Sequence, residues 1–381
     1  MALSTDRDKG AHLLRRFGLG ASEAELDYYL KDGLSGAIDR LLDYEHTDEG
    51  FSVEIERFAN NKNGTLKPQQ VGAWWTLRMM ATQRPLQEKM SLFWHDHFAT
   101  SGEKVQSGPL MFGQNEAIRA NATGNFRTLL AEVSKDPAML FWLDNQYNVK
   151  GKPNENFARE VMELFTLGIG NYTEKDIQEG ARAFTGWSIG RRNGKEVDPT
   201  KGLKGGNSQF IVRQNLHDDG EKTFLGISGT LTGDDVLNHL CDMPRTAEYL
   251  TWKIWTWFAY ENPEPALVSR LASKFREGNL EIKALLRAIM TSPEFYSPKA
   301  DRTVYKCPVD FTISTLRQLG VAQAMANTLD ADGENIRGRI QPILAAYASM
   351  KSMGMQLLYP PDVSGWEGGA NWITSATMME R

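Results

Sequence analysis

The stretch from Asn154 to Trp187, NENFAREVMELFTLGIGNYTEKDIQEGARAFTGW, constrains the fold most strongly, because it predicts two helices joined by a tight glycine turn. In the first helix, Asn156, Glu160 and Glu163 follow the spacing i, i+4 and i+7, which places them on one face. Apolar residues supply a second face: Phe157, Val161, Leu164 and Phe165. One helix therefore carries both a polar and an apolar face that could be buried, which indicates a functional site within a helical fold.

Helical periodicity continues through most of the chain, with no alternating strands that would favour a parallel sheet. At 381 residues, the pattern predicts a mainly α protein with a single large helical domain. The region of about 188–229 is rich in Gly, Lys, Asn and Asp, and it predicts a small inserted β-hairpin or two. The other predicted helices lie at about 22–32, 34–44, 68–82, 86–98, 117–120, 126–135, 139–143, 173–185, 232–242, 244–260, 264–277, 280–291, 308–319 and 336–351, with a short one after Trp372.

Charge and hydropathy exclude several classes of partner. A net charge of −5 argues against nucleic acid as a partner that binds through bulk electrostatics. No apolar run reaches the roughly 18 residues that a membrane span needs, so we expect no span. The N-terminus has no signal-peptide pattern, and the sequence as it stands predicts a cytoplasmic protein. A removed export signal would leave the same evidence, so a periplasmic or extracellular location stays open.

Two histidines flank an aspartate in the motif Phe93-Trp-His-Asp-His-Phe, near the end of a predicted helix. His95 and His97 are two residues apart, so they point in different directions unless the helix unwinds there. If it does unwind, the two imidazoles could hold a divalent metal such as Zn, Fe or Cu, with Asp96 as a ligand or as a hydrogen-bond partner. The alternative is one hydrogen-bonded core histidine and one surface histidine.

The carboxylates of the central helix also allow two interpretations. Glu155, Arg159 and Glu163 form opposite-charge pairs at i, i+4, which is typical of a solvated helix face. A short turn folds the following helix back, however, so that Glu179 and Arg182 could join Glu160 and Glu163 in a buried network. Such a network is structural, or it is the acid–base machinery of an active site.

A third polar motif, His217-Asp-Asp-Gly-Glu-Lys, falls within the predicted hairpin region. Its density of polar side chains indicates a loop that presents them to a ligand. Lys222 could bind an anionic group of a substrate as a point charge. The alternative is an ordinary polar hairpin turn.

These motifs together resemble the bacterial DUF1800 family of proteins of unknown function over nearly the whole chain. The matching stretches are His12-Leu-Leu-Arg-Arg-Phe-Gly-Leu-Gly, Phe93-Trp-His-Asp-His-Phe, Asn154 to Gly168, Ala183-Phe-Thr-Gly-Trp, His217 to Gly226 and Tyr359-Pro-Pro-Asp-Val-Ser-Gly-Trp-Glu-Gly. The resemblance brings no agreed activity. It implies export in many members and a sulfatase-like neighbour protein as a partner. This chain departs from the pattern at Phe165, where similar proteins often carry His.

The motifs support two hypotheses of function. The first is a metal-dependent hydrolase acting on a polar or anionic substrate, either a small molecule or a polymer, with a metal-dependent oxidoreductase as the enzymatic alternative. Its metal ligands would be His95, His97, Glu160 and His217, its catalytic residues Glu160, Glu163 and His217, and its substrate-binding residues Arg159, Lys222 and Trp366. The second is a non-catalytic helical module that binds a peptide or glycan. Convergence of the three motifs in one pocket would favour the enzyme, and their separation would indicate that each is structural.

Overall fold

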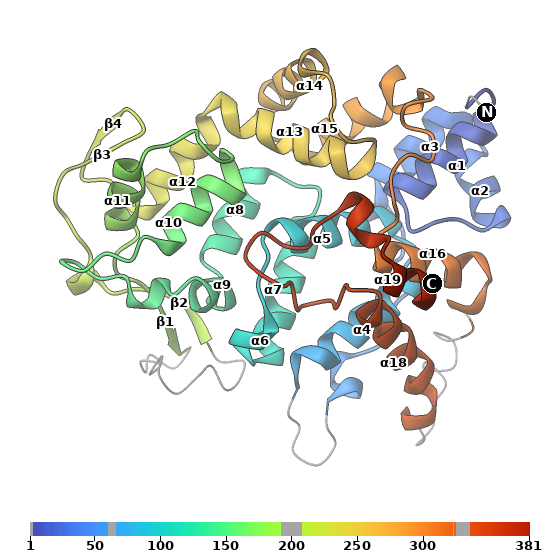
Figure 1. The fold of residues 1–381 in the computed structure, drawn as a ribbon, viewed down its shortest axis with the longest axis horizontal. Helices are drawn as coiled ribbons and strands as arrows, with labels where there is room; N and C mark the ends of the chain where they lie inside the picture. Colours follow the sequence, from blue (N-terminus) through green and yellow to red (C-terminus); the bar gives the residue numbers. More distant parts are fainter. Residues whose placement is uncertain (1–2, 60–65, 192–207, 323, 325–335) are drawn as a thin grey trace.

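Helices make up most of the chain in the computed structural model, which describes residues 3–59, 66–191, 208–322, 324 and 336–381 (Figure 1). The described strands form two antiparallel pairs. The prediction of a mainly α fold with a small β region is therefore confirmed. No helix in these ranges is both long enough and apolar enough to cross a bilayer.

The N-terminal helices pack against one another at one end of the molecule (Figure 1). They are α1 (Asp6–Phe17), α2 (Glu23–Leu30) and α3 (Gly33–Leu42), followed by the 3-10 turns Tyr44–His46 and Ile55–Phe58. The predicted capping box at the start of α2 is present, because the Ser22 side chain accepts from the backbone N–H of Glu25 and the Glu25 carboxylate accepts from that of Ser22. This reciprocal cap fixes where α2 begins.

The central helices carry the aromatic core. They are α4 (Pro68–Ala81), α5 (Pro85–His97), α6 (Gly102–Val105), α7 (Gly108–Ala120), α8 (Phe126–Ser134) and α9 (Pro137–Trp142), with a 3-10 turn at Asn145–Tyr147. Trp75 and Trp94 are completely buried there, whereas Trp252 on a later helix is 44% exposed. The prediction for 117–120 was too short, because α7 already begins at Gly108 with a proline in its first turn.

The central stretch differs from the predicted regular helix. It begins as α10 (Asn156–Glu160) and continues over Val161–Thr166 as a π-helix. The backbone N–H of Leu167 donates to the carbonyl of Met162, five residues earlier, at 2.7 Å. One extra residue in a turn breaks the i, i+4, i+7 register, and such π segments are frequent at functional sites. The following helix is α11 (Glu174–Ala183).

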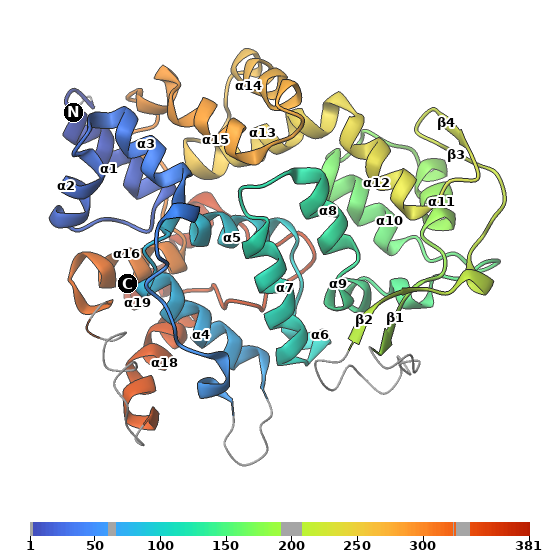
Figure 2. The same cartoon turned by 180° about the vertical axis from the view of Figure 1, so that it is seen from behind.

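Two hairpins occupy the predicted β region. β1 (Trp187–Arg191) pairs with β2 (Ser208–Val212), with Trp187 opposite Val212. β3 (Lys222–Phe224) pairs with β4 (Ile227–Gly229), after a 3-10 turn at Gln214–Leu216. Residues 192–207 of the predicted region lie outside the described residues. Both hairpins lie at the end of the molecule remote from the termini (Figures 1 and 2).

The C-terminal half returns across the molecule. Its helices are α12 (Gly233–Asp242), α13 (Pro244–Phe258), α14 (Pro265–Glu277), α15 (Ile282–Met290), α16 (Pro308–Gln318), α18 (Ile336–Ser352) and α19 (Ser375–Glu380), with 3-10 turns at Pro293–Tyr296 and Gly369–Trp372. Between α18 and α19, an extended segment crosses in front of α5 (Figure 1). Its Leu358 carbonyl accepts from the N–H of Gly102 at 2.8 Å, which holds the segment against the central helices.

Candidate functional site: a cavity beside Asp96 and Lys253

Helix α5 remains regular through His97, so its two histidines point into different surroundings. His95 is buried between Trp75 and Trp366, and its Nε2 accepts from the N–H of Leu358 at 3.1 Å. His97 donates from Nε2 to the Phe165 carbonyl at 3.1 Å. Burial lowers the pKa of both rings, that of His95 to about 3, so both are neutral at pH 7. The two imidazoles therefore fix α5 to the C-terminal segment and to the π-helix.

Asp96, between these histidines, faces the C-terminal segment. Its Oδ1 accepts from the backbone N–H of Trp366 at 2.8 Å. The backbone approaches so closely at Gly365 that a Cβ there would lie 2.4 Å from this oxygen, and Gly365 has a φ of +88°. Both the close approach and the positive φ require glycine at position 365. The Trp366 ring is buried, so the predicted substrate-binding residue contributes its backbone N–H to Asp96 and its indole to the packing of His95.

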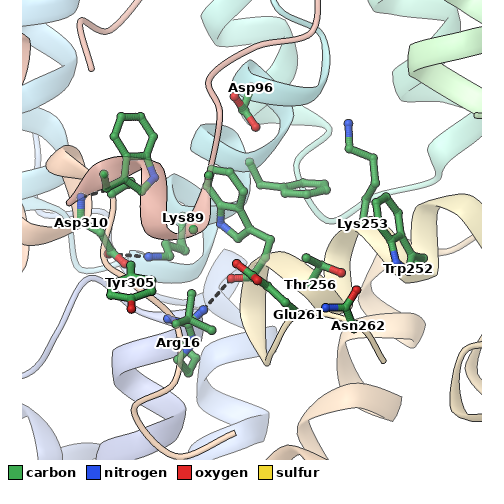
Figure 3. Close-up of a pocket in the computed structure, with 17 residues that line it drawn as sticks. Arg16, Lys89, Asp96, Trp252, Lys253, Thr256, Glu261, Asn262, Tyr305 and Asp310 are labelled. Atoms are coloured by element: carbon green, nitrogen blue, oxygen red, sulfur yellow. Dashed lines mark hydrogen bonds and ion pairs between the residues drawn. The ribbon is translucent and has the colours of Figure 1, made fainter. Parts of the chain in front are cut away.

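A cavity of about 400 Å³ opens between α5, α13 and the C-terminal segment (Figure 3). Lys89, Phe93 and Asp96 line it from α5, where spacings of four and three residues place them on one face. Helix α13 supplies a second wall that includes Lys253. The remaining lining residues are Arg16, Trp252, Thr256, Trp257, Glu261, Asn262, Val304, Tyr305, Cys307, Asp310, Gly368, Gly369 and Trp372. Aromatic walls with a few charged groups are typical of a small-molecule site.

Most buried charges around the cavity are already satisfied within the protein. Lys89 forms an ion pair with Asp310, and Arg16 donates to the carbonyl of Trp257 at 2.5 Å (Figure 3). Arg16 also donates to the carbonyl of Phe258 at 2.7 Å. Asp96 and Lys253 differ, since neither has an ion-pair partner within 4.0 Å among the described residues. Two opposite charges thus line one cavity without neutralising each other, and both are available to a ligand.

The surroundings shift the pKa of Asp96 upward and that of Lys253 downward, so that the uncharged form of each group is favoured. Burial raises the pKa of Asp96 to about 6, against the opposing effects of the Trp366 N–H and the Lys253 charge. Burial also lowers the pKa of the Lys253 ammonium, while the charge of Asp96 partly opposes the shift. A carboxyl that titrates near pH 6 can both donate and accept a proton under physiological conditions.

Of the central-helix carboxylates, Glu160 lies near the same C-terminal segment. Burial raises the pKa of Glu160 to about 7, with further contributions from the negative charges of Glu163 and Asp362. Glu163 itself accepts a short hydrogen bond from the Tyr172 hydroxyl. Arg159, predicted to bind substrate, instead forms a two-pronged ion pair with Glu174 at 2.9 and 3.0 Å on the surface. The Asp362 side of the segment thus approaches α10, and its Trp366 side approaches α5.

The His217 motif forms a separate, internally bonded unit. His217 donates from Nδ1 to the Thr185 carbonyl at 2.8 Å, and the Thr185 hydroxyl accepts from the N–H of Asp218 at 2.8 Å. Lys222 is 2% exposed, and its ammonium donates to the carbonyls of Asp218 and Gly220. Lys222, which the sequence predicted to bind substrate, therefore bonds to the backbone of its own loop. Arg182 joins Asp218 at 2.8 Å and, mainly through this contact, lowers the pKa of that carboxyl to about 2.

The four predicted metal ligands are not brought together. Within the part of the chain that the structure describes, no three His, Cys, Asp or Glu side chains lie close enough to hold a metal ion. The reason is the regular course of α5 through His97 and the use of His217 to bind Thr185. Binding of a divalent metal stays a prediction without a ligand set, and metal analysis of the purified protein tests it.

The three polar motifs do not converge in one pocket: His97 contacts the backbone of the central helix at Phe165, but Asp96 is the only polar member of the three motifs that lines this cavity. The sequence pattern did not indicate Lys253 or Glu261, and it predicted Asp96 only as a metal ligand or as a hydrogen-bond partner of the histidines. One signal was available for Lys253, because it is a lone cation in the aromatic run Thr251-Trp-Lys-Ile-Trp-Thr-Trp-Phe. A single charge within an apolar helix needs a partner or a function.

The fold and this cavity define a mainly helical protein with a polar, aromatic-walled site under its C-terminal segment. The chain belongs to the DUF1800 family: the family model described as "Protein of unknown function (DUF1800)" matches residues 12–381. This result confirms the resemblance inferred from the motifs. Neither the curated proteins nor the solved structures gave a match.

Proposed function

We propose that the protein is a hydrolase that acts by acid–base chemistry in the cavity beside Asp96 and Lys253. The observation that carries the proposal is the pair itself, two opposite charges that line one cavity and are not ion-paired with each other. Buried charged groups without partners are unfavourable for folding, and they are characteristic of sites that act on a ligand. This proposal needs no resident metal.

In this mechanism Asp96 transfers the proton. As a carboxylate it accepts a proton from the attacking water, and as a carboxylic acid it donates one to the leaving oxygen, so that hydrolysis is balanced over one turnover. Its pKa of about 6 populates both forms near neutral pH. The Lys253 ammonium stabilises negative charge that develops on the leaving oxygen before Asp96 protonates it. The aromatic walls restrict access of bulk water, which strengthens both interactions.

Substitution of Asp96 tests the proposal. We would screen fluorogenic 4-methylumbelliferyl esters, phosphates, sulfates and glycosides between pH 5 and 8. Asp96→Asn should lower kcat/KM for the hydrolysed class by about 10²–10⁴-fold, because it removes the proton-transferring group. It should also abolish a limb of the pH–rate profile near pH 6.

The matched control is Asp219→Asn. Asp219 is exposed, and its ion-pair contact with Lys150 is at 3.9 Å, so this variant should keep wild-type turnover. Turnover that survives Asp96→Asn would contradict the proposal. Binding of a ligand in this cavity without turnover of any class would favour the non-catalytic binding module instead.

A further inference from the structure

A second hollow adjoins the cavity along α13. This groove has a volume of about 740 Å³, and it is lined by Glu163, Leu164, Gly168, Ile169, Arg245, Glu248, Tyr249, Trp252, Pro263, Pro265, Val268 and Ser269. Trp252 lines both the groove and the cavity beside Asp96. One indole therefore separates the two spaces, and a ligand that extends past it would occupy both.

A single stripe of α13 runs along both spaces. Arg245, Tyr249 and Trp252 follow one another at spacings of four and three residues, and Thr256 continues the same face into the cavity. From Arg245 to Trp257 the helix rises by about 18 Å at 1.5 Å per residue. That length exceeds a single small metabolite, so the binding surface is matched to an extended ligand.

The floor of the groove is a flat aromatic platform. The rings of Tyr249 and Trp252 are stacked, with centroids 6.1 Å apart and planes inclined by 23°. Trp252 is the most exposed of the ten tryptophans, at 44%, and every one of the ten lies in the described part of the chain. An indole held at the surface by a second ring, between two hollows, is available to stack on a ligand.

The polar groups of the groove fit neutral hydroxyls better than phosphates or a peptide backbone. Glu163 and Glu248 place carboxylates beside the platform, which would repel a nucleic acid. No described strand borders the groove, so a peptide could not add to a sheet edge there. Glu163 accepts from Tyr172. Arg245 donates to the Leu167 carbonyl and lies 3.5 Å from Glu248. The remaining lone pairs and N–H groups of these side chains can serve sugar hydroxyls.

We propose that the extended substrate of this site is an oligosaccharide, which stacks on Trp252 and reaches from the groove into the cavity beside Asp96. The inference rests on the proposed hydrolase and specifies its substrate class. It assigns Trp252 as a residue that binds substrate on the groove side of the reacting bond.

Calorimetric titration with defined sugars tests this inference. The probes are hexasaccharides and disaccharides of cellulose, chitin, xylan and mannan, which are uncharged, titrated into the whole protein. At least one hexasaccharide should bind, and it should bind at least about tenfold more tightly than its disaccharide. Trp252→Ala should weaken this binding by about tenfold or more, as the loss of one aromatic stacking contact does elsewhere, and Trp252→Phe, which keeps a ring, should bind more tightly than Trp252→Ala.

The control is Tyr147→Ala, because Tyr147 is equally exposed, at 45%, and lies on the 3-10 turn Asn145–Tyr147 away from the groove. It should bind the hexasaccharide as the wild type does. The inference is overturned if none of the hexasaccharides binds, if a disaccharide binds as tightly, or if Trp252→Ala binds unchanged. Asp96→Asn should retain hexasaccharide binding, so failure of the proposed hydrolase and failure of the oligosaccharide inference give different results.

Discussion

Glu88→Gln is expected to lower the free energy of unfolding by about 3–5 kcal/mol, the largest effect we predict for a single substitution in this chain. Glu88 is completely buried on α5, and it accepts from Arg119 Nε and from Trp75 Nε1, each at 2.6 Å. Arg78 lies 3.5 Å away. Burial alone would raise the pKa of Glu88, but Arg119 and the other partners outweigh it, so that the pKa is lowered overall. An uncharged amide would leave two guanidinium groups without their central carboxylate.

Glu116→Gln is the matched control for this prediction. Glu116 contacts the same two arginines, but its side chain is 38% exposed, so we expect a loss below about 1 kcal/mol. Urea unfolding followed by circular dichroism at pH 7 measures both variants. Since the folded-state pKa of Glu88 is depressed, its contribution is present above the ordinary carboxyl pKa and is lost as the pH falls. Equal losses in the two variants would contradict a central role for Glu88.

Asp96→Asn is expected to stabilise the protein at high pH, in contrast to its effect on turnover. The pKa of Asp96 is raised from 3.8 in the unfolded chain to about 6 in the fold. The folded protein therefore binds this proton more tightly, and stability falls as the pH rises through the range between these two values. Above about pH 7 the cost of ionising Asp96 is fully present, and it amounts to about 3 kcal/mol. Asparagine removes that cost and can still accept from Trp366.

Unfolding at two pH values measures this effect. At pH 8 we expect Asp96→Asn to be more stable than the wild type by up to about 3 kcal/mol, and at pH 3.5 we expect no gain. The control Asp219→Asn should stay within about 0.5 kcal/mol of the wild type at both values, as surface substitutions usually do. A stability difference for Asp96→Asn that does not change with pH would contradict the raised pKa. A gain in stability together with a loss of turnover is the signature of a group retained for function.

Local features of the fold were predictable because their signals are contained in short stretches. The capping residues Ser22 and Glu25 specify the start of α2, and the apolar periodicity of α13 specifies a buried face. The polar composition around 188–229 correctly predicted hairpins. By contrast, the π-helix at Val161–Thr166 depends on contacts from outside the stretch, such as the bond from His97 to Phe165, so the sequence pattern there predicts only a regular helix.

The site itself could be predicted only in part, because it is assembled from distant segments. Asp96 meets Trp366 across 270 positions of sequence, and Lys253 comes from a third segment. Side-chain spacing cannot show which buried charges find partners. Lys222 and Arg159 are hydrogen-bonded or ion-paired within the protein. Lys253, by contrast, lies over the Tyr249 ring at 5.6 Å and has no ion pair within 4.0 Å among the described residues. The sequence pattern therefore predicted substrate binding at residues that hold loops and helices together, and it did not indicate the pair of Asp96 and Lys253.

The reactivity of Lys253 tests the central claim most directly, since it requires no knowledge of the substrate. The wild type and Asp96→Asn would be acetylated with limiting N-hydroxysuccinimidyl acetate at pH 7, and each lysine would be quantified by mass spectrometry. An amine with a lowered pKa in an open cavity should react faster than the exposed Lys274 on α14. In Asp96→Asn the rate should rise further, because the negative charge that raises the pKa of Lys253 is gone. A Lys253 that stays unmodified, or that reacts no faster than Lys274 and does not respond to Asp96→Asn, would contradict a pair of free, coupled groups in one functional cavity.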